Sequence, residues 1–255
     1  MTTTNLKALW ADGRCAVNGW MLTPSPMAAE LMAGAGYDCL TIDLQHGLIE
    51  YSDMLAMLQA MSGSRAAPVV RVTELNAGQI GRVLDAGAQA LICPLVNTHE
   101  QAEMLVRAVK YPPAGVRSFG PVRAAMQAGM GPYFGRANID IATLAMVETA
   151  QAMDNLEDIV SVPGLDGIYI GPADLSIGLG LGLPGPELHP ELAAAMERVR
   201  DACERHGKVA AVHQVPGIAP SALGAQGFGF VTSGSDVEFL RTGAVRAVQV
   251  ARPGT

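Results

Sequence analysis

Aromatic residues are scarce in this sequence, and stretches that could cross a membrane are missing. Only 5% of the 255 residues are Phe, Trp or Tyr, so a core must be built from Ala, Val, Leu, Ile and Met. No apolar run approaches the roughly 20 residues that a spanning helix needs. The opening segment, residues 1–5, lacks the basic and apolar regions of a signal peptide, which predicts a cytoplasmic protein.

Clusters of basic residues are also lacking. The formal net charge is -7, and the 17 Lys and Arg residues are dispersed along the chain. Binding to nucleic acid or to an anionic membrane through a basic patch is therefore not expected. The four cysteines form no CxxC pair, and Cys39 and Cys93 lie in apolar runs. We interpret them as buried small hydrophobic residues; a catalytic or disulfide role is the alternative.

What the sequence does contain is an alternation of short apolar runs with longer amphipathic stretches, repeated eight times. This pattern is typical of parallel strands joined by helical crossovers. A single-domain (β/α)8 TIM barrel is the simplest architecture for eight such units. A doubly wound open sheet is the alternative, although no Gly-x-Gly-x-x-Gly follows the first strand. The predicted strands are residues 15–22, 39–43, 68–72, 90–93, 144–147, 167–170, 209–213 and 228–232.

Two segments interrupt the alternation. Residues 110–138 are long for a connection between a helix and a strand, and residues 178–190 are rich in Gly and Pro. Loops of this length are usually functional or mobile.

Residues 167–178, Gly-Ile-Tyr-Ile-Gly-Pro-Ala-Asp-Leu-Ser-Ile-Gly, organise the expected site. The predicted strand there stops at Gly171-Pro172 and is followed by Asp174, while the preceding strand ends in Glu148. Two successive strands that each deliver one acid predict a divalent metal site, and oxygen ligands favour Mg²⁺ or Mn²⁺. The alternative is that each acid stabilises the first turn of the following helix.

Other polar residues also follow the ends of predicted strands. Arg71 offers a planar guanidinium for a carboxylate or enolate oxygen, or an ion pair inside the mouth. His46, close to Asp43, is a candidate general base or a solvated loop residue. His213 ends the seventh strand, where a place at the mouth, packing or a subunit contact are all open. Asp85 lies near the end of the third helix and is read as a solvated residue or a local pair.

Several motifs resemble the HpcH/HpaI aldolase family, the metal-dependent class II pyruvate aldolases, from about residue 9 to about residue 250. The motifs are Asp43-Leu44-Gln45-His46-Gly47, Pro68-Val69-Val70-Arg71-Val72, Leu84-Asp85-Ala86-Gly87-Ala88, Tyr111-Pro112-Pro113-Ala114-Gly115-Val116-Arg117, Val147-Glu148-Thr149 and Gly171-Pro172-Ala173-Asp174-Leu175-Ser176.

The resemblance implies a barrel of the phosphoenolpyruvate/pyruvate type and a reversible cleavage of 4-hydroxy-2-oxo acids. It also implies hexamers, trimers of dimers, in which a C-terminal helix of about 235–251 is exchanged between subunits. The implied cofactor is Mg²⁺, Mn²⁺ or Co²⁺, and the implied partners are a keto acid, an aldehyde and further copies of the chain. The implied site residues are Glu148 and Asp174 as metal ligands, His46 as base, Arg71 at the pyruvate oxygens, Asp43 and Asp85 as acids supporting the histidine region, Trp20 in the substrate pocket, and the backbone of Gly171, Pro172, Ala173 and Asp174 as the cradle of the pyruvate carboxylate.

Two sequence features refine this resemblance. Met146 stands where the family's type member has a glutamine, two positions before the metal-binding glutamate. Residues 118–123, Ser-Phe-Gly-Pro-Val-Arg, resemble the hydroxyketoacid aldolases, which accept hydroxypyruvate as well as pyruvate. An acyl-CoA ester lyase of the malyl- or citramalyl-CoA type and a keto-acid-binding barrel without catalysis remain alternative functions.

Overall fold

The computed structural model describes residues 3–126 and 128–252, and its centre is a closed barrel of eight parallel strands. The strands pair in sequence order, and β8 returns to pair with β1. The predicted (β/α)8 barrel is confirmed, and each predicted strand overlaps an observed one. The strands are β1 (Ala16–Met21), β2 (Cys39–Asp43), β3 (Ala67–Arg71), β4 (Ala90–Cys93), β5 (Ala142–Val147), β6 (Gly167–Ile170), β7 (Val209–Val212) and β8 (Phe230–Ser235).

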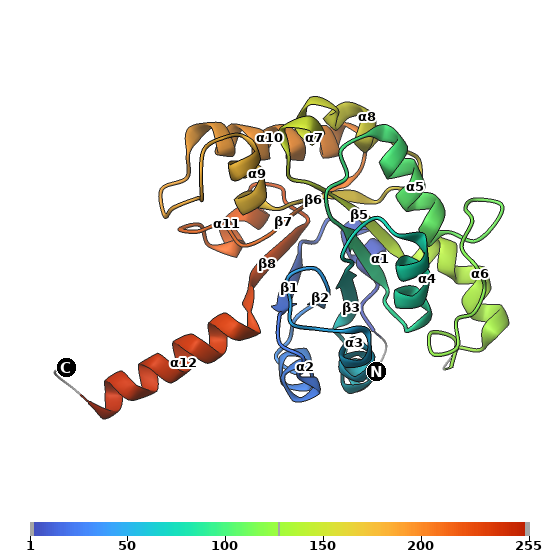
Figure 1. Ribbon diagram of the computed structural model, residues 1–255, viewed down its shortest axis with the longest axis horizontal. Helices are drawn as coiled ribbons and strands as arrows, with labels where there is room; N and C mark the ends of the chain where they lie inside the picture. Colours follow the sequence, from blue (N-terminus) through green and yellow to red (C-terminus); the bar gives the residue numbers. More distant parts are fainter. Residues whose placement is uncertain (1–2, 127, 253–255) are drawn as a thin grey trace.

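Helices connect the strands and surround the barrel (Figure 1). They are α1 (Leu6–Ala11), α2 (Pro26–Ala33), α3 (Tyr51–Ala60) with the 3₁₀ turn η1 (Met61–Gly63), α4 (Ala77–Asp85), α5 (His99–Val109), α6 (Met130–Asp140), α7 (Ala150–Asp154), α8 (Leu156–Ser161), α9 (Pro172–Gly178), α10 (Pro190–Arg205), α11 (Pro220–Ala225) and α12 (Asp236–Ala251). Within the described ranges, none of these helices is long and apolar enough to cross a membrane.

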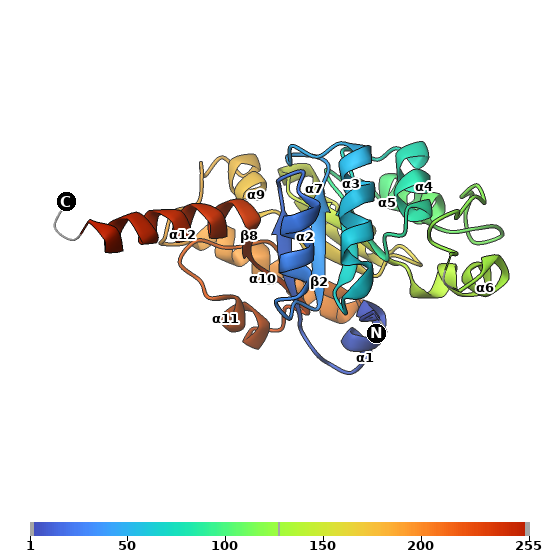
Figure 2. The same ribbon diagram turned by 90° about the horizontal axis from the view of Figure 1, so that it is seen from below.

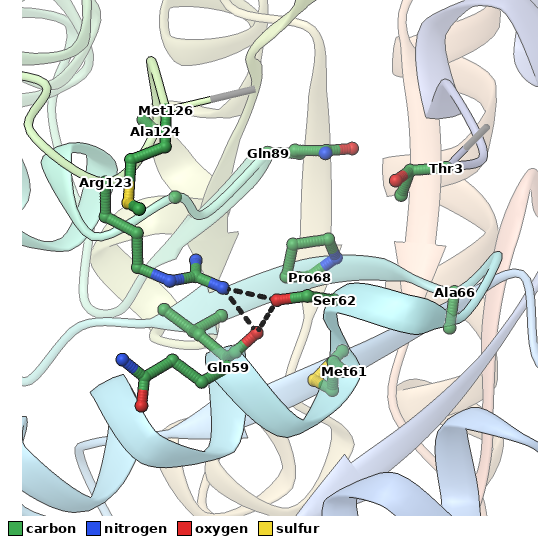
Figure 3. Close-up of a pocket in the computed structure, with 12 residues that line it drawn as sticks. Thr3, Gln59, Met61, Ser62, Ala66, Pro68, Gln89, Arg123, Ala124 and Met126 are labelled. Carbon is green, nitrogen blue, oxygen red and sulfur yellow. Dashed lines mark hydrogen bonds between the residues drawn. The ribbon is translucent and has the colours of Figure 1, made fainter. Parts of the chain in front are cut away.

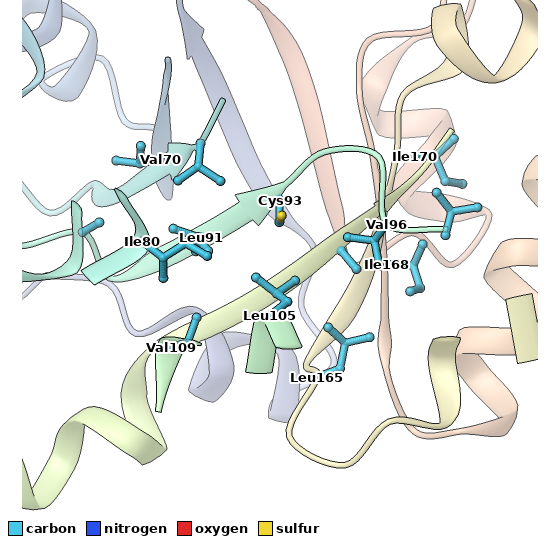
Figure 4. Close-up of a cluster of buried hydrophobic side chains, with 14 of the residues drawn as sticks. Val70, Ile80, Leu91, Cys93, Val96, Leu105, Val109, Leu165, Ile168 and Ile170 are labelled. Atoms are coloured by element: carbon cyan, nitrogen blue, oxygen red, sulfur yellow. The ribbon is translucent and has the colours of Figure 1, made fainter. Parts of the chain in front are cut away.

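The larger hydrophobic core lies between the strands and the helices. Figure 4 shows part of this core, with Val70 and Leu91 of the sheet, Ile80 of α4, Leu105 of α5 and Ile168 of β6 among its members. Strands covered on both faces read as continuous apolar runs, which is why the sequence shows them clearly. The four cysteines are free, and Cys39 and Cys93 are buried as expected.

The barrel interior is filled by the alternate, inward-facing residues of each strand. Small side chains such as Ala67, Ala90 and Ala142 occupy its N-terminal end, and α1 closes that end with Leu6 and Leu9. Three of the scarce aromatic residues, Trp20, Tyr169 and Phe230, also fill this interior, and its remaining positions are mainly small or aliphatic.

The long segment between α5 and β5 lies at the N-terminal end of the barrel, away from the carboxyl ends of the strands. It contains helix α6, most of which falls within residues 110–138, where the sequence predicts a loop. Arg117 and Ala124 bond to Asp85, the last residue of α4. A loop in this place does not cover the carboxyl ends of the strands in its own chain.

Helix α12 extends away from the rest of the chain in both Figure 1 and Figure 2. Its first turn is anchored by Asp236, whose carboxylate accepts the backbone N–H groups of Leu22 at 2.9 Å and Thr23 at 3.0 Å. Beyond that turn its residues are exposed, including Leu240 at 73% and Val248 at 55%. Apart from the contacts of α12 with β1 and β8, these apolar side chains are left without packing among the described residues.

Candidate active site

The alternation of inward and outward residues brings the predicted polar residues together at the carboxyl end of the barrel. Asp43, Arg71, Glu148 and His213 each stand two positions after an inward-facing residue. Because side chains repeat every two residues along a strand, all four point toward the barrel axis. Those preceding residues are Thr41, Val69, Met146 and Ala211, all fully or almost fully buried.

Asp43 and Arg71 form a buried ion pair between neighbouring strands. They are register partners of β2 and β3, and Arg71 Nε donates to Asp43 Oδ1 at 2.8 Å while Nη2 donates to Oδ2. Burial opposes ionisation of Asp43, but the hydrogen bonds and charge of Arg71, aided by the backbone amides of Gln45 and His46, outweigh it and lower the pKa of the carboxyl group. Asp43 is therefore a fixed anion that orients its neighbours.

Trp20 lies beneath this pair. Its indole N–H donates to Asp43 Oδ2 at 3.2 Å, and the guanidinium carbon of Arg71 lies 4.9 Å from the ring centroid. Asp43 and Trp20 together hold the guanidinium plane in one orientation. No acceptor for Arg71 Nη1 is found among the described residues, so that nitrogen remains available to a ligand.

His46 is exposed in the loop that follows β2. Its backbone N–H donates to Asp43 Oδ1 at 3.3 Å, which fixes the loop and not the imidazole. The predicted association of Asp43 with His46 therefore operates through the backbone in this chain. A groove of about 910 Å³ is lined by Gln45 and Gly47, the neighbours of His46, and by residues of α3, α4 and the loop after β3; His46 itself does not line it.

Glu148 is 3% exposed and is held by an unusual segment of backbone. Its Oε1 accepts the N–H of Leu95 at 2.8 Å, and Leu95 adopts φ 54, which non-glycine residues seldom do. On the other side, a Cβ at position 171 would lie 2.7 Å from Glu148 Oε2, so a larger residue there would displace the carboxylate. The Leu95 contact could not be predicted, because a backbone donor in a left-handed conformation has no residue signature.

Asp174 stands in the exposed first turn of α9, next to Ala173 and after the buried Gly171 and Pro172. Gly171, as N-cap, provides no side-chain cap to this turn. Burial raises the pKa of Glu148, the Leu95 N–H and Arg71 lower it in part, and the charge of Asp174 raises it further. The two carboxylates are thus close enough for their negative charges to interact.

A divalent cation fits this pair. Glu148 uses one oxygen on Leu95 and keeps Oε2 against the open space of Gly171, and Asp174 adds a second carboxylate. In the described part of the chain, no group of three or more His, Cys, Asp or Glu residues could hold a metal. Two carboxylates with other positions left to water or substrate oxygens are typical of Mg²⁺ or Mn²⁺ sites.

Asp85 is not brought to this site. It ends α4 at the N-terminal end of the barrel and accepts a hydrogen bond from Arg117 at 2.7 Å. Within one chain it is far from the mouth, because α4 runs from the carboxyl end of β3 back to the amino end of β4. Its predicted role in the reaction stays a prediction and would require a second copy of the chain.

Figure 3 shows a pocket of about 400 Å³ at this same N-terminal end. Arg123 points into it but donates to Ala86 O at 2.6 Å, Leu58 O at 2.7 Å and Ser62 Oγ at 2.6 Å. The guanidinium thus holds the ends of α3 and α4 together, and we assign this pocket no part in a reaction.

The whole chain resembles known aldolases. The sequence profile of the HpcH/HpaI aldolase/citrate lyase family matches residues 18–242. A hydroxypyruvate/pyruvate aldolase of Rhizorhabdus wittichii is 36% identical over 97% of this chain and 98% of its own. A 4-hydroxy-2-oxo-heptane-1,7-dioate aldolase of Klebsiella pneumoniae is 38% identical over 91% of this chain and 88% of its own. The crystal structure of a HpcH/HpaI aldolase/citrate lyase family protein from Burkholderia cenocepacia superposes with a TM-score of 0.86 at 30% identity, covering 98% of this chain and 100% of that one.

Proposed function

The chain belongs to the HpcH/HpaI aldolase/citrate lyase family, and we propose that it is a metal-dependent aldolase. It reversibly cleaves 4-hydroxy-2-oxo acids to an aldehyde and pyruvate or hydroxypyruvate. The observation that carries this proposal is the buried Glu148, which faces Asp174 and Arg71 at the mouth of the barrel.

Glu148 and Asp174 would hold the cation, which is Mg²⁺, Mn²⁺ or Co²⁺. When bound, such a cation supplies positive charge to the keto oxygen as a Lewis acid. The contribution of Glu148 depends on its fixed position between the Leu95 amide and Gly171. The backbone from Gly171 to Asp174 lies alongside and is suited to the carboxylate of the keto acid.

Arg71 stabilises the charge that develops on the substrate. As the C3–C4 bond breaks, its electron pair moves into the keto acid and gives an enolate whose oxygen is negative. Arg71 Nη1, held in place by the Asp43 pair, donates to that oxygen. A donor that is already oriented costs no reorganisation during the reaction, which is the main advantage of such sites.

His46 is the general base in the cleavage direction. Its imidazole takes the proton from the C4 hydroxyl, and the aldehyde carbonyl forms as the C3–C4 bond breaks. In the reverse direction the same ring returns the proton to the new hydroxyl. The exposed position of His46 leaves its imidazole accessible to an aldehyde.

A Schiff-base mechanism lacks its nucleophile. The lysines Lys7, Lys110 and Lys208 gather near Asp166 at the N-terminal end of the barrel. Lys110 and Lys208 donate to the backbone carbonyls of Asn138 and Leu165, each at 2.7 Å. No lysine of the chain therefore reaches the mouth.

Turnover with controlled metal content tests the proposal. Pyruvate release from 4-hydroxy-2-oxo acids is measured after EDTA treatment and after addition of Mg²⁺, Mn²⁺ or Co²⁺. We expect no release from the treated protein and recovery with the metals. Equal turnover with and without metal would contradict the proposed mechanism, and no turnover with any keto acid or acyl-CoA ester would favour a binding protein.

We also propose that the chain forms homo-oligomers, as a hexamer built from dimers that exchange α12. The exposed apolar residues of that helix, among them Phe239, Leu240 and Val248, support this proposal. Light scattering should give a multiple of the 26.5 kDa chain mass. Leu240→Asp together with Val248→Asp should reduce the mass, whereas a monomeric wild-type protein would contradict the proposal. The cytoplasmic location stays a prediction.

A further inference from the structure

His213 is the polar residue of the mouth that the mechanism leaves unused. It follows β7 directly, and its ring lies edge-on to Trp20, with 4.6 Å between centroids and an interplanar angle of 76°. Its Nδ1 lies 3.0 Å from the hydroxyl of Tyr169, a fully buried residue of β6. The histidine is therefore held on two sides by buried aromatic rings.

A buried chain of hydrogen bonds sets the direction of that contact. Asn18 Oδ1 accepts the hydroxyl of Thr41 at 3.0 Å, which leaves Asn18 Nδ2 to donate to Thr232 Oγ1, also at 3.0 Å. Thr232 then has one acceptor among the described residues for its own proton, the Tyr169 oxygen at 2.8 Å. Tyr169 in turn donates to His213 Nδ1. Only in this direction does every hydroxyl proton in this series of hydrogen bonds have an acceptor.

The imidazole is thereby fixed in one tautomer. Because Nδ1 accepts, the proton of neutral His213 is on Nε2. Burial and the nearby Arg71 charge lower the pKa of His213 to about 4, and the Asp43 charge opposes them only in part. The ring is therefore neutral across the physiological pH range.

The Nε2–H group has no partner in the described part of the chain. It is also not among the fully enclosed polar atoms that lack a hydrogen bond, and His213 stands at the carboxyl end of β7, where the mouth lies. A donor that is partly buried and unpaired costs free energy until something accepts from it. Arg71 and the backbone from Gly171 to Asp174 already face the anionic enolate and carboxylate oxygens of the keto acid. The uncharged Nε2–H group of His213 therefore suits an uncharged oxygen of the substrate.

We propose that His213 is a specificity-determining residue whose Nε2–H donates to a hydroxyl group of the substrate. This inference rests on the proposed aldolase function and deepens it. The hydroxyl belongs to the donor, as in hydroxypyruvate, or to the aldehyde, as in glycolaldehyde. A substrate that lacks the hydroxyl leaves the N–H unpaired, so the enzyme prefers the hydroxylated compound.

Two pairs of substrates test the inference and separate the two sources of the hydroxyl. Hydroxypyruvate is compared with pyruvate at one fixed aldehyde, and glycolaldehyde with acetaldehyde at one fixed donor, as ratios of kcat/KM. His213→Phe keeps an aromatic ring against Trp20 but removes the donor. It should lower the ratio in one of the pairs by about tenfold, the effect of one hydrogen bond to a neutral group.

Matched variants show whether the hydrogen bond itself is responsible. His213→Gln restores an N–H donor and should recover part of the ratio. Tyr169→Phe keeps the ring and removes the hydroxyl that fixes the tautomer, so it should give a smaller loss in the same pair. His206→Phe, at the surface end of α10, removes a histidine outside the mouth and should change neither ratio.

The tautomer can be observed without turnover. Nitrogen-15 NMR of the histidine rings, assigned with the His213→Phe variant, should show Nε2 protonated and Nδ1 unprotonated at neutral pH. Unchanged ratios in both pairs for His213→Phe, or an Nδ1-protonated ring, would overturn the inference. Loss of metal-dependent cleavage in the wild-type protein would instead overturn the aldolase proposal itself.

Discussion

The two ends of the barrel differ in how their charged side chains are paired. At the N-terminal end Lys7 bonds to Asp166 at 2.6 Å, Lys208 to Leu165 O, Arg117 to Asp85 and Arg123 to three oxygens, although the buried Nε and Nη1 of Arg117 have no partner among the described residues. At the carboxyl end, the buried Glu148 accepts one hydrogen bond from a backbone amide, and the negative charge of Asp174 lies close enough to interact with it. A paired charge can be accommodated inside a fold, whereas an uncompensated buried charge is typical of a functional site.

Glu148→Gln should have the largest effect on turnover, because it removes the buried charge at the carboxyl end of the barrel. We expect the variant to lose turnover by more than about 10³-fold, because removing a key electrostatic group at an active site has effects of that order. Its stability without metal should not fall, since burial raises the pKa of the carboxyl group and its charged form is costly. Steady-state turnover and thermal unfolding measure the two effects.

Asp166→Asn is the control at the other end of the barrel. It removes the partner of Lys7 and accepts the Thr143 amide less well, so it should lower stability. Its turnover should stay close to that of the wild-type protein. A turnover loss equal to that of Glu148→Gln would show that the two ends do not differ as described.

Arg123→Met should affect stability and leave turnover almost unchanged. Its guanidinium holds the ends of α3 and α4, and the loss of these hydrogen bonds should cost about 2 kcal/mol. Urea unfolding measures this loss. The comparison would fail if Arg123→Met retained full stability and lost turnover.

The Asp43–Arg71 pair makes stability at the mouth depend on pH. The pKa of Asp43 is lowered from its ordinary 3.8, so its contribution is complete above that value and is lost as pH falls through the folded-state pKa. The difference in unfolding free energy between the wild-type protein and Asp43→Asn should be largest at neutral pH. It should shrink below pH 3.8, and a difference that grows on acidification would reverse the assignment.

Leu95→Gly should have the smallest effect. The variant relieves the positive φ of Leu95 and keeps the N–H that bonds to Glu148. After the entropy cost of glycine, we expect a gain of about 0.5 kcal/mol in unfolding free energy. A clear loss in thermal unfolding would show that the exposed leucine side chain contributes more than its backbone strain.

The strands and the pair of acids that follow β5 and β6 could be predicted because their signals are local. A strand buried on both faces is an apolar run, and an acid at its end, as in Val147-Glu148, is conspicuous. Helix α6 was harder to predict, since Gly131, Pro132 and Gly135 near its start resemble a loop. Its helical form depends on tertiary context that no single segment carries.

The contacts around the site could not be predicted in the same way. The Tyr169–Thr232–Asn18 chain could have been found by following the inward-facing positions of every strand, because polar residues inside a barrel are unusual. The Leu95 amide has no such signal. The family resemblance indicates Asp85 as a site residue, but only the direction of α4 shows that Asp85 lies at the N-terminal end of the barrel, opposite the site.

Binding of Mn²⁺ tests the central claim most directly. Electron paramagnetic resonance counts the bound and free ion in a titration of the wild-type protein, Glu148→Gln and Asp166→Asn. We predict one strong site per chain in the wild-type protein and in Asp166→Asn, and none in Glu148→Gln. Unchanged binding in Glu148→Gln would contradict the assignment of the metal site to the carboxyl end of the barrel.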